Sequence, residues 1–421
     1  MKEADDKALK RDIGFFGSAF LSFNGVVGAG IFALPATLYM QFGDFSPWLF
    51  PLFGLLVLVI AVPFSRVAAH HPVSGGPVVY AAAFGSAVSF QAGWIYYVAR
   101  SAALAANANV LITYLSTLWS PLSEGVARAA TILAVVGAIT FINIVGVKRA
   151  VRFLDALTLL KAAPLLFVAI LGLIVAGGSI QAPAAVPPLT ELEAAALLIL
   201  YAFVGFENSV VPAGETRDAQ RTVPRALIAT ILATATLYFL VQLSYVAVME
   251  PGEGGDAPMV AFGTALMGPA GGLLLTAAAV FSLLGNISGG MTGTTRTTYA
   301  LGRDGLLPGW FGKVSERYAT PSNSVLFMGG LVALLALTGS FVWLAVVSTL
   351  ARMIVYSISI ASLPRAERGK PLIWLMVIAA IAVCVWAASQ TAWPSWRALL
   401  ALVAVGTMLY LIARRARVRP E

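Results

Sequence analysis

Long apolar segments recur along the chain and constrain its fold more than any other feature. Each runs for about 17 to 26 residues, which suits a hydrocarbon core of about 30 Å crossed at 1.5 Å per residue. Only 11% of the 421 residues are charged and 59% are hydrophobic, whereas an ordinary globular domain carries about 25% charged residues. The segments are also too long for barrel strands. The sequence therefore predicts an all-helical integral membrane protein.

We predict twelve membrane-spanning helices in a single membrane domain without a soluble catalytic module. Their expected positions are residues 13–40, 47–68, 88–117, 127–146, 152–177, 190–214, 225–249, 270–295, 322–338, 341–362, 371–390 and 395–413. The longest connection, about 296–321, is expected to hold a short amphipathic helix. Lys10 and Arg11 lead into the first span without a small-residue cleavage pattern, so we expect this span to remain in the mature protein.

The distribution of basic residues predicts the orientation in the membrane. Three basic residues lie well inside the spans: Arg100, Lys161 and Arg352. Only Arg128 and Arg397 fall on one set of loops, whereas the remaining Lys and Arg lie at the termini and on the alternate loops. Cytoplasmic loops are enriched in basic residues. We therefore expect a multi-pass protein of the cell's inner (cytoplasmic) membrane, with cytoplasmic tails at residues 1–12 and 414–421.

The composition argues against several classes of partner and site. The net charge of +8 reflects topology and contact with anionic lipid, so no nucleic-acid partner is expected. Cys384 is the only cysteine, and His70 and His71 have no cysteine or carboxylate pattern around them, so we expect no disulfide framework, metal site or cofactor. No histidine or cysteine lies deep in the spans near a partner that would make a nucleophile and base, which predicts that the chain is not an enzyme.

Two predicted spans contain residues that interrupt a helix. The first holds "NGVVGAGIFALP" from Asn24 to Pro35, in which each glycine costs about 1 kcal/mol relative to alanine and the proline removes a donor. The sixth holds "YAFVGFENSVVPAGE" from Tyr201 to Glu215. For the first stretch taken alone, close helix packing is an equally good explanation. The two interrupted helices are the first and the sixth predicted span, so each begins one of two successive sets of five spans. This arrangement indicates an inverted-repeat transporter, in which unwound backbone holds the substrate.

Four segments, in order along the chain, resemble motifs of the amino acid permeases of the amino acid–polyamine–organocation (APC) superfamily. They are "GVVGAGIFALP", "HHPVSGGPVVYAAAFGSAVSFQAGW", "AFVGFENSVVPAGETRDAQRTVPRAL" and "RTTYALGRDGLLP". The resemblance implies a leucine-transporter-type fold with a ten-helix core at 13–362. Its inverted repeats would occupy about 13–177 and 190–362, with discontinuous helices 1 and 6 and two peripheral helices within 363–413.

The resemblance also implies a substrate site built on backbone. It assigns two stretches to substrate binding: Val27, Gly28, Ala29, Gly30 and Ile31 in the first helix, and Phe203, Val204 and Gly205 in the sixth. Amides of the glycine triplet would bind a carboxylate at the positive end of a half-helix, and the sixth-helix carbonyls would accept from an ammonium group. Ala29 offers no hydroxyl, which leaves carboxylate binding to the backbone.

Lys161, in "LTLLKAAPLLF", is the most informative ionisable residue within a predicted span. The resemblance implies that its ammonium replaces the sodium ion that bridges the first and eighth helices in sodium-coupled relatives. Transport would then need no sodium. The alternative is a buried lysine paired with Asp155 or with backbone carbonyls. A buried lysine can also lose its proton in one conformation, so proton coupling and exchange both stay open.

The third predicted span carries a polar stripe, in which Tyr96 and Arg100 are candidates for the same site. Tyr96, Arg100, Ala103 and Asn107 recur at intervals of three and four and share a face. Tyr96 resembles a cavity-lining tyrosine of the family. Arg100 departs from the family's small or apolar residue. We expect it to pair with Glu207, and an unpaired Arg100 would attract anionic side chains.

The remaining candidates each have a structural alternative. Glu207 is expected to be a structural or gating carboxylate rather than a direct ammonium ligand. Tyr201 either closes over the substrate, as an aromatic does in the family, or simply packs. Ser282 and Asn286 share a face with two glycines and either pack there or line the cavity opposite Lys161.

Together these patterns predict a secondary active transporter of amino acids that works by alternating access. Neutral amino acids are favoured because Ala29, Phe203 and Val204 offer an apolar surround. The alternatives are a transporter or exporter of cationic amino acids, polyamines or other amines, and, more remotely, a membrane sensor of amino acids. The direction of transport, the oligomeric state and the partner of Arg352 are left open by the sequence.

Overall fold

The computed structural model describes residues 11–73, 75–146, 148–177, 183, 185–367 and 370–418. Within these ranges every regular element is a helix, and one isolated bridge pairs Ile13 with Thr216. The all-helical prediction is thus confirmed. Most of the two predicted tails, residues 1–10 and 419–421, lies outside the described part of the chain.

The first part of the chain, as far as residue 177, forms helices separated by short turns. The elements are α2 (Phe15–Val26), α3 (Ala29–Ala33), α4 (Pro35–Phe42), η1 (Gly43–Trp48), α5 (Leu49–His70), α6 (Pro77–Ala81), η2 (Ala82–Phe84), α7 (Ser86–Ser116), η3 (Ser120–Leu122), α8 (Gly125–Val145) and α9 (Lys148–Val175). The predicted first span is therefore divided into three helices, and the break after α2 falls within the glycine-rich stretch.

The second part of the chain repeats this mixture of long and interrupted helices. The elements are α10 (Leu189–Tyr201), η4 (Phe206–Val210), η5 (Ala213–Glu215), α11 (Ala219–Val248), α12 (Pro258–Met267), α13 (Pro269–Arg303), α14 (Ser322–Thr338), α15 (Phe341–Ile360), α16 (Leu363–Ala366), α17 (Pro371–Ser389) and α18 (Trp393–Val418). The sixth predicted span is again broken, because α10 ends at Tyr201 and short 3-10 turns follow.

Nine helices in the described residues are long and apolar enough to cross a membrane. They correspond to nine of the twelve predicted spans. The other three predicted spans form the helices α7, α9 and α14. Of these, α14 (Ser322–Thr338) and the Lys161–Val175 part of α9 are apolar but shorter than a membrane span, and α7 does not meet the criteria of length and composition. The count of twelve spans therefore stays a prediction.

The prediction of a separate short amphipathic helix between residues 296 and 321 is wrong. Helix α13 continues to Arg303, and turns follow it. Gly305 has a φ of +63°, and the amides of Leu306 and Leu307 both donate to the carbonyl of Leu301, so the chain turns back on the end of α13. A short helix that the sequence did not suggest, α12, lies instead before α13 and packs against it.

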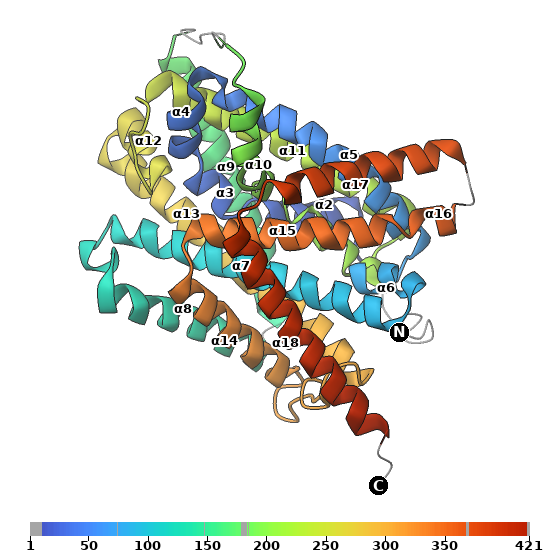
Figure 1. Ribbon diagram of the computed structural model, residues 1–421. Helices are drawn as coiled ribbons and strands as arrows, with labels where there is room; N and C mark the ends of the chain where they lie inside the picture. Colours follow the sequence, from blue (N-terminus) through green and yellow to red (C-terminus); the bar gives the residue numbers. More distant parts are fainter. Residues whose placement is uncertain are drawn as a thin grey trace.

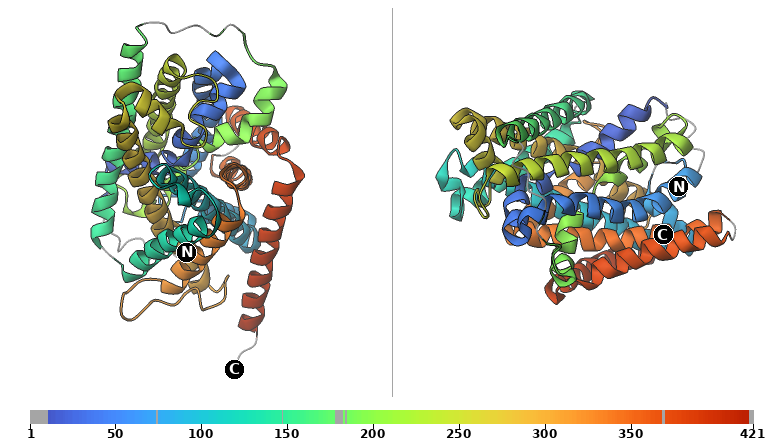
Figure 2. Two further views of the ribbon diagram at one scale, coloured as in Figure 1. Left: turned by 90° about the vertical axis from the view of Figure 1, so that its left-hand side faces the viewer. Right: turned by 90° about the horizontal axis from the view of Figure 1, so that it is seen from above.

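The long helices pack around α7. Helices α13 and α15 both pack against α7, and α11 packs against α5. In Figure 1, α5, α15 and α17 run in similar directions across the view. Figure 2 shows α18 along one side of the bundle, where it contacts α7 and α15 before it leads to the C-terminus. Both broken helices pack against unbroken ones, α2 against α11 and α10 against α15.

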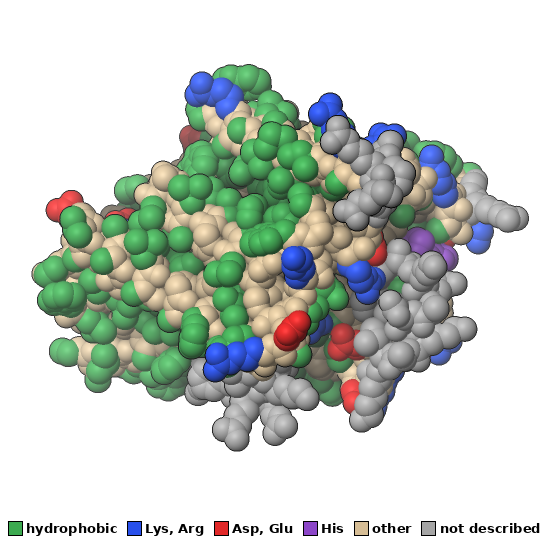
Figure 3. All heavy atoms as spheres, turned by 90° about the horizontal axis from the view of Figure 1, so that it is seen from below, with side chains coloured by type: hydrophobic (Ala, Val, Ile, Leu, Met, Phe, Trp, Pro, Cys, Tyr) green, Lys and Arg blue, Asp and Glu red, His purple; other side chains and the backbone are tan. Residues whose placement is uncertain are grey.

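The surface agrees with a protein that lies in a membrane. In Figure 3 hydrophobic side chains cover much of the face seen from below, and Lys and Arg gather toward the right of that view. Large apolar side chains such as Phe16, Phe141 and Leu375 are more than 60% exposed. Exposed apolar surface of this extent suits contact with lipid.

Candidate functional site

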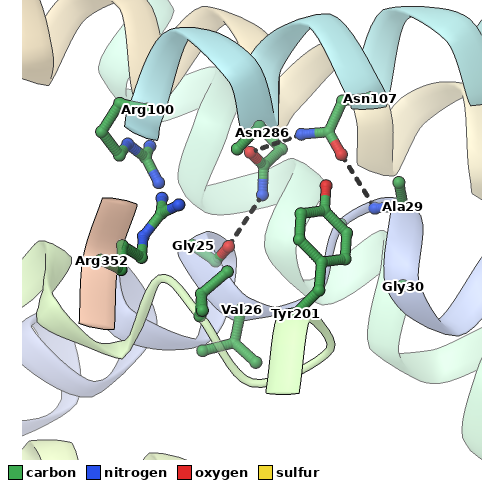
Figure 4. A pocket seen from close by; sticks show the side chains of 12 residues that line it. Gly25, Val26, Ala29, Gly30, Arg100, Asn107, Tyr201, Asn286 and Arg352 are labelled. Carbon is green, nitrogen blue, oxygen red and sulfur yellow. Dashed lines mark hydrogen bonds between the residues drawn. The ribbon is translucent and has the colours of Figure 1, made fainter. Parts of the chain in front are cut away.

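A small pocket lies where the two helix breaks meet α7, α13 and α15 (Figure 4). It is lined by Gly25, Val26, Gly28, Ala29, Gly30, Arg100, Ala103, Asn107, Tyr201, Val204, Asn286 and Arg352. The cavity volume is only about 10 Å³, which is room for about one water molecule. A molecule as large as an amino acid would fit there only after lining side chains move.

The two breaks are in direct contact through their glycines. Gly205 has a φ of +114°, a conformation that glycine adopts at little cost. A Cβ added at Gly205 would lie 2.4 Å from the carbonyl carbon and oxygen of Gly25, and a Cβ at Gly25 would lie 2.5 Å from the Gly205 carbonyl oxygen. Ser22 adds a hydrogen bond of 2.6 Å from its hydroxyl to the carbonyl of Phe206. The absence of side chains at these glycines lets the two backbones touch.

The side chain of Asn107 is hydrogen-bonded to the first backbone amide of α3. The Ala29 amide donates to Asn107 Oδ1 at 2.9 Å. Asn107 Nδ2 donates to Asn286 Oδ1 at 2.8 Å, and Asn286 Nδ2 in turn donates to the carbonyls of Asn24 and Gly25. This hydrogen-bonded chain links α3, α7, α13 and α2. The Gly28 amide donates to the Val26 carbonyl at 2.9 Å, so two of the three amides expected to bind a carboxylate are already paired in this conformation.

Lys161 lies against the end of α2. Its side chain is fully buried, and Nζ donates to the Asn24 carbonyl at 3.1 Å, to Asn24 Oδ1 at 2.5 Å and to the Val27 carbonyl at 2.9 Å. Ser282 Oγ donates to the same Val27 carbonyl at 3.3 Å. The ammonium thus bonds the carbonyls at the first break, beside α13. The alternative partner, the Asp155 side chain, lies outside the described residues.

Glu207 pairs with Arg352, so the expected pairing of Arg100 with Glu207 is wrong. Glu207 Oε1 accepts from Arg352 Nε at 2.9 Å, and Oε2 accepts from the Tyr356 hydroxyl and from the Gly205 amide, both at 2.8 Å. Both charged side chains are fully buried. The carboxylate therefore joins the sixth-helix break to α15, and the structural or gating role of Glu207 stays a prediction.

The guanidinium of Arg100 lies against α13. A Cβ added at Gly290 would lie 2.6 Å from Arg100 Nη2. The lack of a side chain at Gly290 therefore makes room for the guanidinium. Arg100 Nε is buried without a hydrogen-bond partner in the described part of the chain. Figure 4 shows the Arg100 and Arg352 guanidinium groups close together at one end of the pocket, with Ala29 and Gly30 at the other.

The structure brings some of the predicted site residues into the pocket and leaves others outside it. Those that line it are Gly28, Ala29, Gly30, Arg100, Tyr201, Val204 and Asn286; those that are buried nearby without lining it are Val27, Ile31, Tyr96, Lys161, Phe203, Gly205, Glu207 and Ser282. Phe203 packs against Phe50 and Tyr238, with ring centroids 6.4 and 6.1 Å away. The pocket is therefore less apolar than the sequence predicted.

Tyr201 lies between the two ends of the pocket (Figure 4). Its ring also contacts Phe341 edge to face, with centroids 5.8 Å apart. The position suits a side chain that closes over a substrate, and the contact with Phe341 suits simple packing, so both interpretations of Tyr201 remain.

Several lining residues were not proposed as site residues. Asn107 and Ala103 belonged to the predicted polar stripe with Arg100, and that periodicity was the signal that could have found them. Gly25 and Val26 belong to the broken stretch of the first helix. Arg352 was recognised as a charge within a span. Its partner Glu207 is 145 positions away along the chain, so no local sequence pattern could predict the pair.

Comparison with known proteins decides the family. A family model described as amino acid permease matches residues 13–412 of this chain. The chain belongs to the amino acid permease family. This confirms the resemblance to the APC permeases, and the family's members are transporters rather than enzymes.

Individual members of the permease family are similar over most of the chain. An uncharacterized transporter of Mycobacterium tuberculosis (strain ATCC 25618 / H37Rv) is 29% identical over 430 residues, covering 97% of this chain and 93% of the relative. The branched-chain amino acid permease BcaP of Bacillus subtilis (strain 168) is 27% identical over 446 residues, covering 97% and 94%. The cadaverine/lysine antiporter of Escherichia coli (strain K12) is 26% identical over 348 residues, covering 80% and 76%.

Proposed function

We propose that this permease is a sodium-independent secondary active transporter of amino acids that works by alternating access. Twelve helices cross the membrane, and the first ten form inverted repeats at about 13–177 and 190–362. Two peripheral helices follow within 363–413. The proposal is supported by family membership and by the contact between two interrupted helices, α2–α3 and α10–η4.

The position of Lys161 carries the proposal of sodium independence. The C-terminal end of a helix presents unpaired carbonyls and attracts a cation. At the end of α2 that cation is the Lys161 ammonium, bonded to the carbonyls of Asn24 and Val27. An ammonium fixed to the protein supplies the positive charge that a bound sodium ion would otherwise bring. Loss of its proton in one conformation would couple transport to protons.

The substrate is held between the two breaks. Its carboxylate binds the amides of Gly28, Ala29 and Gly30 once Asn107 has released the Ala29 amide and the Val26 carbonyl has released the Gly28 amide. Its ammonium group binds sixth-helix carbonyls around Val204. This arrangement uses unwound backbone at the centre of the bundle as the donor and acceptor set.

The permease lies in the inner membrane of the cell with both termini in the cytoplasm. This orientation is supported by the basic residues at the termini and on alternate loops. Within the same class, transport of cationic amino acids or polyamines is the alternative, and it is favoured by similarity to the protein named cadaverine/lysine antiporter. A sensor that binds amino acids without moving them would show binding but no flux.

Uptake into proteoliposomes tests the proposed function. Purified permease is reconstituted, and the initial rates of radiolabelled leucine, glutamate and lysine uptake are measured in sodium buffer and in choline buffer, with and without a pH gradient. We expect equal rates in the two buffers for the transported substrate. Lys161→Met should reduce the rate by about tenfold or more, because the carbonyls at the end of α2 lose their cation, whereas Lys313→Met on a loop should leave it unchanged.

Two results would contradict this function. A strict requirement for sodium would remove the role of Lys161. Binding of amino acids without flux above that of protein-free liposomes would indicate a sensor.

A further inference from the structure

Buried charge is unbalanced in the described part of the chain. Four charged side chains are buried there: Arg100, which is 3% exposed, and Lys161, Glu207 and Arg352, which are fully buried. Three of the four are cations and one is a carboxylate. A charge held away from water needs a partner, so the core lacks negative charge.

Two of the cations already have acceptors. Lys161 is bonded to carbonyls at the end of α2, and Arg352 Nε is bonded to Glu207. The carboxylate of Glu207 is itself committed to three donors, because Tyr356 and Gly205 also bond to it. It has little capacity left to compensate a further cation.

Arg100 is the buried cation that is bonded to no anion in the described part of the chain. Among the described residues no hydrogen bond or ion pair from its guanidinium is found, and its Nε is a buried donor without an acceptor. Arg352 contributes a second buried donor without an acceptor, Nη2. Both arginines line the pocket. Unpaired donors on buried guanidinium groups beside a pocket define a site for an oxyanion.

The two arginines lie at the end of the pocket opposite the amides of α3. In Figure 4 their guanidinium groups are close together at one end, Ala29 and Gly30 are at the other, and Asn286 and Tyr201 lie between. A substrate whose α-carboxylate binds the α3 amides would therefore direct its side chain toward Arg100 and Arg352. A guanidinium presents its donors in a planar fork that matches a carboxylate.

We propose that the permease selects amino acids with an acidic side chain, whose second carboxylate binds Arg100 and the free Nη2 of Arg352. This inference rests on the proposed function, because it assumes that the amino acid binds between the helix breaks. An acidic side chain supplies the missing negative charge. A neutral side chain leaves Arg100 uncompensated, and a cationic one adds repulsion.

Equilibrium binding to the purified full-length permease tests this selectivity. The dissociation constants of L-glutamate, L-aspartate, L-glutamine, L-asparagine, L-leucine and L-lysine are measured by isothermal titration calorimetry in detergent. Each amide is nearly isosteric with its acid, so the comparison isolates the negative charge. We expect the acids to bind at least about tenfold more tightly than their amides, and lysine to bind most weakly.

Substitution of Arg100 provides the residue-specific test. Arg100→Met keeps the length of the side chain and removes the charge, so the affinity for glutamate should fall by about tenfold or more while that for glutamine stays equal or rises. Arg397→Met removes an exposed arginine from α18 and should leave both affinities unchanged. Arg100→Gln serves as a second variant if the methionine variant does not fold.

The outcomes separate this inference from the function on which it rests. Equal affinity for glutamate and glutamine, or tighter binding of leucine or lysine, would overturn the selectivity while amino acid binding and flux persist. An equal loss of glutamate and glutamine affinity in Arg100→Met would also overturn it, because Arg100 would then act through structure. Failure of every amino acid to bind the folded wild type would overturn the proposed function itself.

Discussion

Glu207 and Arg352 form a fully buried ion pair in this permease, with 2.9 Å between Oε1 and Nε. The sequence identified Arg100, Lys161, Glu207 and Arg352 as notable charges, and all four are buried. It could not assign the pairs, because Glu207 and Arg352 are 145 positions apart and their pairing depends on where α15 crosses the sixth-helix break. The choice between Arg100 and Arg352 is made by tertiary geometry, with Gly290 providing space for Arg100.

Asn107 allows a test at the scale of one hydrogen bond. Its Oδ1 accepts from the Ala29 amide, so a substrate carboxylate that uses this amide must displace it. A hydrogen bond contributes about 1 kcal/mol net, so Asn107→Ala should tighten substrate binding by about fivefold, as measured by calorimetry.

Asn109→Ala is the matched control, since Asn109 lies on the same helix and bonds to the carbonyls of Ala336 and Gly339. It should lower the Tm and leave substrate affinity unchanged. Weaker binding in Asn107→Ala would show instead that Asn107 itself holds the substrate.

The elements follow the sequence closely where glycine and proline decide them. The break after α2 lies within the glycine-rich stretch, and the break after α10 lies just before Gly205. Local chemistry controls both, since glycine weakens a helix and accepts the positive φ. Helix α12 was missed because its ten residues lie in a connection between spans, where no long apolar run marks it. The junction between the two breaks depends on approach in three dimensions and had no signal in either stretch.

Gly205→Ala tests the contact between the breaks. An alanine would be strained at a φ of +114° and its Cβ would lie 2.4 Å from the Gly25 backbone, so we expect the variant to lose at least about 2 kcal/mol of stability and nearly all transport. Gly293→Ala is the control, because a Cβ there meets no atom within 4 Å and alanine favours the helix. Tm and uptake rate are measured for both variants. Wild-type Tm and uptake in Gly205→Ala would show that the breaks do not need this close approach.

At the scale of the whole molecule, a polar cluster connects the C-terminal end of α5 with the segment between α16 and α17. Glu367, between α16 and α17, accepts from Arg66 Nε at 2.9 Å and lies 3.1 Å from His70 Nε2. Arg66 also donates to the second carboxylate oxygen. No pattern near His70 in the sequence suggested this partner, because the contact spans about 300 positions of the chain.

The pH dependence of this cluster can be derived from Glu367. Burial raises the pKa of its carboxyl, but hydrogen bonds from Arg66 and His70 outweigh that effect and hold the pKa below the usual 4.5. A carboxyl whose pKa is lowered by folding adds stability above its unfolded pKa and loses it as the pH falls through the folded pKa. We expect Glu367→Gln to lower the stability by up to about 1 kcal/mol at pH 7. The deficit should shrink below about pH 4.5, as measured by Tm against pH. A deficit that is the same at pH 4 and pH 7 would show that the charge of Glu367 contributes nothing.

The most direct test of the account is a structure determined by electron cryomicroscopy with the tightest-binding amino acid at saturating concentration. The account predicts density for that amino acid between the α3 amides of Ala29 and Gly30 and the guanidinium groups of Arg100 and Arg352, with Asn107 Oδ1 no longer bonded to the Ala29 amide. An amino acid bound elsewhere, with the Asn107 to Ala29 hydrogen bond intact, would contradict it.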